Sequence, residues 1–133
     1  MGATDAALMR ELYDRFNAGE YERTAELLHP EVELHQWTAI PDTDTYVGRE
    51  QFVRGISRWI GGFEPGFQFR VEDVREQEGR VWMRVRLSGR GRESGVPLEH
   101  EVVHVWEVRD RMGFRCRVFS NEEEAWRALA PPR

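Results

Sequence analysis

The sequence predicts an α+β fold in which helices come first and an antiparallel sheet follows. Apolar residues recur at helical spacing up to Ile60, and from Phe67 onward they alternate with polar residues at every second position. Short glycine-containing turns join the alternating segments, which is typical of strands linked as hairpins. Helices followed by hairpin-linked strands indicate the α+β class.

The first half of the chain is predicted to contain three helices and one strand. In the first helix, the apolar residues Leu8, Leu12 and Phe16 recur every four positions behind a capping residue. The segments, in order, are a helix between the cap Thr4 or Asp5 and the stop Asn17-Ala18-Gly19, a short helix over 21–28 ended by His29-Pro30, a strand over 31–36, a polar loop, and a helix between Gly48 and Gly61-Gly62.

The second half is predicted to form four strands and a closing helix. Turns such as Gly95-Val96-Pro97 and Asp110-Arg111-Met112-Gly113 separate the alternating segments. Ser120 or Asn121 caps the closing helix, and glutamates fill its first turn, where they suit the helix dipole. The strands are expected at 67–72, 81–88, 98–108 and 114–119, with Trp126 and Leu129 docking the closing helix.

Length and composition indicate a single domain over residues 1–133. A chain of this size buries roughly two-thirds of its unfolded surface, so it needs no metal or disulfide to fold. A net charge of −5 argues against nucleic acid as a partner. No apolar run approaches the ~20 residues of a membrane span, and the N-terminus lacks a signal-peptide pattern. Together with the single cysteine, Cys116, these features predict a cytoplasmic protein.

Four short motifs follow one another along the chain. They are LYDRFNAG over 12–19, LLHPEVE over 27–33, YVGRE over 46–50 and HVWEVRD over 104–110. In this order they resemble the nuclear transport factor 2-like superfamily and, within it, the SnoaL-like (polyketide-cyclase-like) family. The resemblance implies a cone-shaped antiparallel sheet of about six strands, wrapped around the three N-terminal helices, with an open-ended pocket and a short C-terminal helix.

The resemblance also allows known catalytic groups to be sought at matching positions. Ketosteroid isomerases use one tyrosine and two aspartates, and the matching positions here hold Leu12, Gln36 and Val103. Limonene epoxide hydrolases use an Asp-Arg-Asp relay, whereas the matching strand here is apolar on its concave face. SnoaL-like cyclases use a pocket aspartate, and no aspartate lies in the predicted strands beyond residue 79. The chain therefore lacks the catalytic sets of these families.

Residues 100–104 match the H-E-x-x-H pattern of zinc enzymes. That pattern binds a metal when it is helical, because residues four apart then share one face. Here Val102, Val103 and Trp106 favour a strand, on which His100 and His104 would be about 13 Å apart. We therefore expect no metal site and no cofactor.

Strand alternation divides this segment into two faces. His100, Val102, His104 and Trp106 share one face, and Glu101, Val103 and Val105 share the other. The resemblance to the isomerases places the second set inside the cone. Glu101 would then be an isolated carboxylate suited to general acid–base catalysis. The alternative is a rim glutamate paired with an arginine such as Arg49.

The predicted pocket is largely apolar and suits a small hydrophobic molecule with one or two polar atoms. In the predicted wall, the side-chain amide of Gln36 can orient a ligand carbonyl but cannot act as a base. The predicted wall consists of Leu12, Phe16, Leu34, Gln36, Trp37, Phe52, Ile56, Trp59, Met83, Val85, Leu87, Val103, Val105, Cys116 and Val118.

The outward face of the predicted sheet combines aromatic and arginine side chains. Trp82, Trp106 and Phe119 would lie there beside four arginines, a combination that is common at protein interfaces. This predicts a homodimer through the outer sheet face. The alternative is a set of arginines paired with nearby glutamates.

Two functions remain open at this point. One is a small-molecule-binding or dimerisation domain without catalysis, which the missing catalytic groups favour. The other is a cofactor-free isomerase, cyclase or dehydratase acting on a small hydrophobic substrate, with Glu101 as the acid–base group. Because this fold carries many activities, the fold itself does not choose between them.

Overall fold

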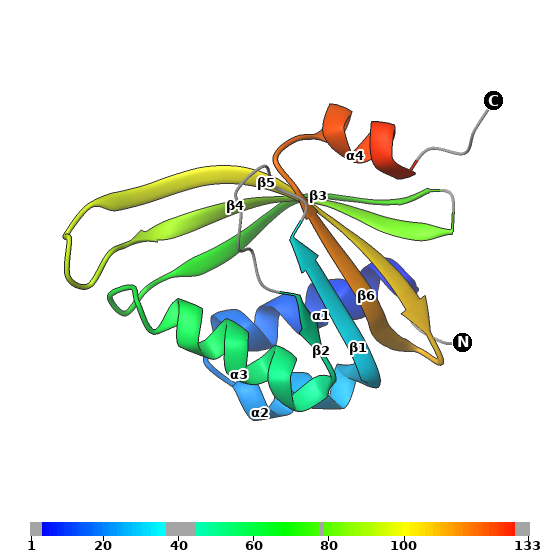
Figure 1. Cartoon of the computed structure of the whole chain (residues 1–133), viewed down its shortest axis with the longest axis horizontal. Helices are drawn as coiled ribbons and strands as arrows, with labels where there is room; N and C mark the ends of the chain where they lie inside the picture. The colour runs from blue at the N-terminus through cyan, green and yellow to red at the C-terminus, as the bar shows by residue number, and fades with distance from the viewer. Residues whose placement is uncertain (1–3, 37–44, 78, 130–133) are drawn as a thin grey trace.

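The computed structural model describes residues 4–36, 45–77 and 79–129 (Figure 1). The predicted order of helices and strands is confirmed. The elements are α1 (Asp5–Asn17), α2 (Tyr21–Thr24), the 3-10 turn η1 (Ala25–Leu27), β1 (Leu28–Gln36), β2 (Tyr46–Val47), α3 (Arg49–Ile60), β3 (Gln68–Gln77), β4 (Arg80–Arg90), β5 (Pro97–Arg109), β6 (Met112–Phe119) and α4 (Glu122–Leu129). Among the described residues, the helices are too short and too polar to cross a bilayer.

The six strands form one curved, open sheet in the order β2-β1-β6-β5-β4-β3. Strands β3 to β6 pair as antiparallel neighbours, and so do β1 and β2, but β1 runs parallel to β6. The sheet is therefore mixed, which corrects the prediction of a purely antiparallel one. Hairpin turns fix the relative direction of consecutive strands only. The direction of β1 relative to β6 was not predicted, because the two strands lie far apart in the sequence.

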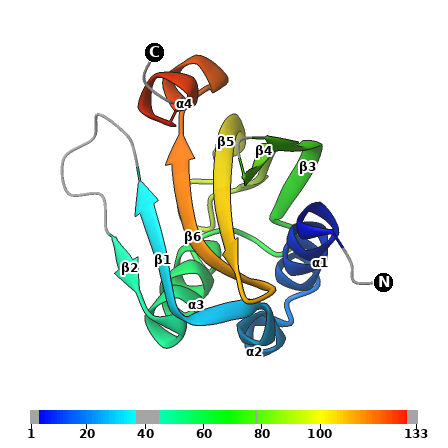
Figure 2. The ribbon, with the colours of Figure 1, turned by 90° about the vertical axis from the view of Figure 1, so that its right-hand side faces the viewer.

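Helices cover both faces of this sheet (Figures 1 and 2). Helix α1 packs on β3 and β4 and α3 packs on β1 and β2, all on the concave side, whereas α4 packs on β5 and β6 from the convex side. Thr4 caps α1 as predicted, because its Oγ1 accepts a hydrogen bond from the Ala7 backbone N–H at 3.1 Å. Helix α1 buries Met9, Leu12, Tyr13 and Phe16.

Two elements near the second motif differ from the prediction. The second helix is shorter than expected, and strand β1 already begins at Leu28, so that Pro30 lies within it. The register between β1 and β6 shifts between Leu28 and Glu33, which accommodates a proline that cannot donate to a ladder. Strand β2 lies at the edge of a segment predicted to be a loop. It was not predicted, because its two residues are too few to show alternation.

The sheet has an apolar core on each side. The larger core lies between the concave face and helices α1 and α3. The smaller one lies under α4 and comprises Trp82, Val103, Val105, Phe119, Ala125 and Leu129, with Trp126 stacked on Trp82 at a ring distance of 4.8 Å. Strand β5 is consequently buried on both faces from Val102 to Trp106.

Candidate ligand-binding site

A cavity of about 570 Å³ lies between the concave face of the sheet and helices α1 and α3. Its wall is mostly aromatic and aliphatic, and none of its described lining residues carries a carboxylate, a guanidinium or an ammonium group. The lining residues are Tyr13, Phe16, Leu34, Tyr46, Phe52, Ile56, Trp59, Phe69, Leu87, His100, Val102, His104, Trp106, Cys116, Val118, Phe119 and Ser120.

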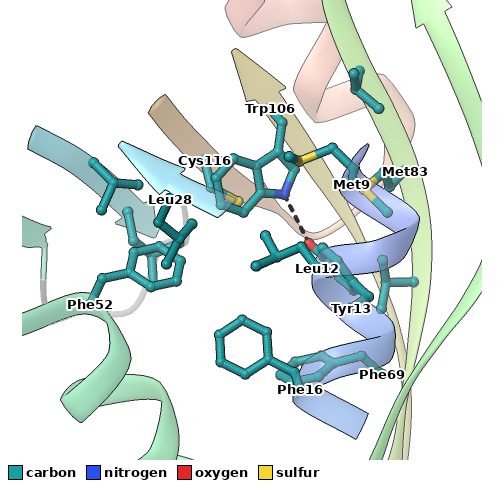
Figure 3. Close-up of a cluster of buried hydrophobic side chains, with 14 of the residues drawn as sticks. Met9, Leu12, Tyr13, Phe16, Leu28, Phe52, Phe69, Met83, Trp106 and Cys116 are labelled. Carbon is teal, nitrogen blue, oxygen red and sulfur yellow. Dashed lines mark hydrogen bonds between the residues drawn. The ribbon is translucent and has the colours of Figure 1, made fainter. Parts of the chain in front are cut away.

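Three buried polar side chains meet at this wall. The Trp106 Nε1–H donates to the Tyr13 hydroxyl oxygen at 3.0 Å (Figure 3). The same hydroxyl lies 2.5 Å from His104 Nδ1, which makes a short hydrogen bond. Tyr13 is in α1, whereas His104 and Trp106 are two residues apart on β5 and therefore share its concave face. A hydrogen-bonded group thus links the first helix to the fifth strand inside a largely apolar cavity.

Burial keeps this group uncharged. Desolvation lowers the pKa of His104 to about 4, so its imidazole is neutral at pH 7. Desolvation also raises the pKa of the Tyr13 hydroxyl well above its usual value, so that the proton stays on the oxygen. The pKa of the Cys116 thiol is raised for the same reason, which leaves it a poor nucleophile.

Two glycines make room for aromatic rings at the cavity. A Cβ on Gly113 would lie 2.7 Å from Trp106 Cζ3, so glycine leaves the room that the indole ring needs beside β6. A Cβ on Gly55 of α3 would lie 2.5 Å from Tyr46 Cζ, so the Tyr46 ring occupies the space that a larger residue would fill. The positions of the Trp106 and Tyr46 rings thus depend on glycine at residues 113 and 55.

The model of the SnoaL-like domain family matches residues 9–113. The chain belongs to the SnoaL-like family. No curated protein matches the chain.

Several solved structures share the SnoaL-like fold. Bal32a from a soil-derived mobile gene cassette is 20% identical, with a TM-score of 0.79 and 96% of each chain covered. An NTF2-like protein from Burkholderia thailandensis E264 is 22% identical, with a TM-score of 0.77, covering 98% of this chain and 100% of the other. A protein from Jannaschia sp. CCS1 that carries the provisional name SnoaL-like polyketide cyclase is 20% identical, with a TM-score of 0.75 and 99% of each chain covered. At these identities the likeness shows the fold alone.

The cavity of this SnoaL-like domain contains part of the wall predicted from the sequence. Phe16, Leu34, Phe52, Ile56, Trp59, Leu87, Cys116 and Val118 line it. Leu12, Met83 and Val85 are instead buried in the concave core, and Val103 and Val105 lie under α4 on the convex side. Trp37 and the side chain of Gln36 lie outside the described residues. The polar group was not predicted, because strand alternation combined with the isomerase resemblance places His104 and Trp106 on the outer face.

Glu101 lies on the convex face of β5, not in the cavity. Its carboxylate pairs with Arg84 at 3.5 Å and with Arg86 at 3.3 Å, and 43% of its side chain is exposed. The expectation of an isolated pocket carboxylate is therefore wrong, and the alternative of an arginine-paired glutamate describes it, with Arg84 and Arg86 in place of Arg49. Arg86 also approaches Glu72 at 3.3 Å, so this part of the outer face is a network of ion pairs.

The three aromatic residues predicted to form a dimer contact are buried within one chain. Trp82 and Phe119 lie under α4, and Phe119 also reaches the edge of the cavity, whereas Trp106 lines the cavity. Docking of the closing helix by Trp126 and Leu129 was predicted, but not which face of the sheet α4 covers. These residues therefore do not form a free outer surface.

His100 and His104 occupy one strand, as predicted, and both face the cavity. His100 is exposed at the mouth, whereas His104 is 8% exposed and lies deeper. Within the described residues, no group of three or more histidine, cysteine or carboxylate side chains is placed to hold a metal ion.

Proposed function

We propose that this SnoaL-like domain binds a small, largely apolar molecule in the cavity between α1, α3 and the concave face of the sheet. The observation that carries the proposal is an apolar cavity of about 570 Å³ with one buried hydrogen-bonded group, Tyr13–His104–Trp106, in its wall. Ligand sites commonly have this volume and this combination of apolar walls with few polar groups.

The alternative of an isomerase, cyclase or dehydratase using Glu101 has no support from the geometry. An acid–base group must come within hydrogen-bond reach of the reacting atom, and Glu101 lies on the other side of the sheet. The lining residues that the structure describes include no carboxylate that could replace it. We therefore propose binding and assign no reaction.

Two further expectations from the sequence bear on this proposal. The cytoplasmic location stays a prediction. We do not propose a dimer through Trp82, Trp106 and Phe119, since these side chains pack inside one chain. The face formed by Arg84, Arg86 and Glu101 carries exposed ion pairs.

The indole N–H signals of the tryptophans provide a test with an internal control. Trp59 and Trp106 line the cavity, whereas Trp82 of β4 stacks on Trp126 of α4 on the opposite side of the sheet. We expect a rigid apolar probe such as 2-adamantanone to shift the Trp59 and Trp106 signals in a saturable titration. The Trp82 and Trp126 signals should stay in place.

A cavity-filling variant completes the test. Val118→Trp places a large side chain into the cavity and should abolish the shift at Trp106 while the protein still melts cooperatively. Saturable shifts confined to Trp82 and Trp126, or no saturable shift with any apolar probe, would show that the cavity is not a binding site.

A further inference from the structure

The hydrogen-bond directions in the buried group can be deduced from its members. An indole N–H can only donate, so Trp106 occupies a lone pair of the Tyr13 oxygen. Among the described residues, the Tyr13 proton then has one acceptor within reach, His104 Nδ1 at 2.5 Å. His104 Nδ1 is therefore the unprotonated nitrogen, and the proton of the neutral imidazole is on Nε2.

The opposite arrangement is less favourable. If Nδ1 carried the proton and donated to Tyr13, the Tyr13 O–H would have no acceptor and Nε2 would have no donor among the described residues. Two buried polar sites would then be unsatisfied, whereas the first arrangement leaves only the Nε2–H. That N–H makes no hydrogen bond to any described residue, although the side chain is only 8% exposed and lines the cavity.

This step rests on the proposed function: we propose that the cavity selects a neutral molecule that carries a hydrogen-bond acceptor, such as a ketone oxygen. The His104 Nε2–H donates a hydrogen bond to that acceptor. A buried donor without a partner in the protein favours a ligand that supplies an acceptor. Two charged classes fit less well. An anion would be desolvated with no described cation in the wall, and an ammonium group would meet a donor and no carboxylate.

The ligand test uses probes of the same rigid cage that differ only in the polar group. These are 2-adamantanone, its isostere 2-methyleneadamantane, which lacks the acceptor, 2-adamantylamine and adamantane-2-carboxylate. We expect the ketone to bind about five- to tenfold more tightly than the methylene isostere, which is the contribution of one neutral hydrogen bond. The ammonium and the carboxylate should bind more weakly than the ketone.

Two variants locate the preference. Tyr13→Phe combined with His104→Phe and Trp106→Phe removes the hydroxyl, imidazole and indole donors of the buried group, so the ketone and the isostere should bind equally. The matched control is His35→Phe on β1, where His35 pairs with Glu33 at 2.7 Å, outside the cavity wall; it should keep the preference. Thermal denaturation shows whether each variant is folded.

The tautomer can be measured on the unmodified protein, which keeps the proposal testable if the triple variant does not fold. Long-range proton–nitrogen correlation at pH 7 separates protonated from unprotonated imidazole nitrogens. We expect protonated Nε2 and unprotonated Nδ1 at His104, and a shift of the Nε2 signal on adding the ketone.

The outcomes separate this inference from the proposed function. If no probe binds in the cavity, both fail. If the isostere binds as tightly as the ketone, if the ammonium binds more tightly, or if Nδ1 carries the proton, the selection by His104 is wrong while binding in the cavity stands.

Discussion

Replacing His104 with phenylalanine should remove a large part of the acid sensitivity of this protein. The pKa of His104 is lowered from 6.5 to about 4, because burial disfavours the charged imidazolium. Between those pH values the unfolded chain binds a proton at this position that the folded state does not bind. The free energy of unfolding contributed by His104 is therefore fully present above pH 6.5 and is lost as the pH falls toward 4.

The magnitude follows from the size of the shift. One pKa unit corresponds to 1.36 kcal/mol, so a shift from 6.5 to about 4 corresponds to about 3 kcal/mol. This is a substantial fraction of the total stability of a small domain. Contributions from other groups are common to the wild type and the variant and cancel in the difference.

Urea unfolding at several pH values between 4 and 7 measures this quantity. The stability advantage of the wild type over His104→Phe should shrink by about 3 kcal/mol from pH 7 to pH 4. His100→Phe is the matched control, because His100 lies exposed on the same strand face and its replacement leaves the buried imidazole in place. A difference between wild type and His104→Phe that stays constant, or grows on acidification, would refute the burial of a neutral His104.

Two other substitutions test neighbouring parts of the account. Gly113→Ala should lower stability by about 1–3 kcal/mol, because the new Cβ would lie 2.7 Å from the Trp106 ring; an unchanged Trp106 indole signal and melting temperature would contradict this packing. Glu101→Gln should change stability by less than about 1 kcal/mol and leave probe binding unaltered, since its ion pairs are exposed. Loss of probe binding in that variant would show that Glu101 contributes to the binding site.

The order of the elements could be predicted because caps, turns and periodicity are local. Thr4 caps α1, and the turn at Asp110 and Arg111 joins β5 to β6, with both residues at positive φ, as the two-residue hairpins require. The SnoaL-like motifs extended these local signals to the whole chain. Where a strand was only two residues long, as in β2, no periodicity existed to be found.

The faces of β5 could not be predicted, and a bulge explains why. Counting back from the turn, Val108 pairs with Gly113, but Glu107 pairs with Arg115, so Phe114 is an extra residue. Without this bulge, Val105 would pair with Cys116 and share its face. With the bulge, Trp106 pairs with Cys116 instead. The β5 side chains that precede Val108 in the sequence therefore change sides relative to β6.

Hydrophobicity could not correct this error, because β5 is buried on both faces. The concave face lines the cavity and the convex face lies under α4, so apolar residues occupy consecutive positions from Val102 to Trp106. The register with β4 carried the missing information: Met83 was correctly placed on the concave side, and it pairs with His104. Tyr13 was missed because the isomerase alignment directed attention to its neighbour Leu12, although the structure buries both residues.

A crystal structure with 4-bromo-2-adamantanone bound would test the central claim most directly. The anomalous signal of the bromine locates the probe independently of the rest of the density. The account predicts the bromine in the cavity beside Phe52 and Trp106, with the ketone oxygen within hydrogen-bond distance of His104 Nε2. An ordered bromine under α4 or on the convex face, with the cavity free of probe, would contradict it.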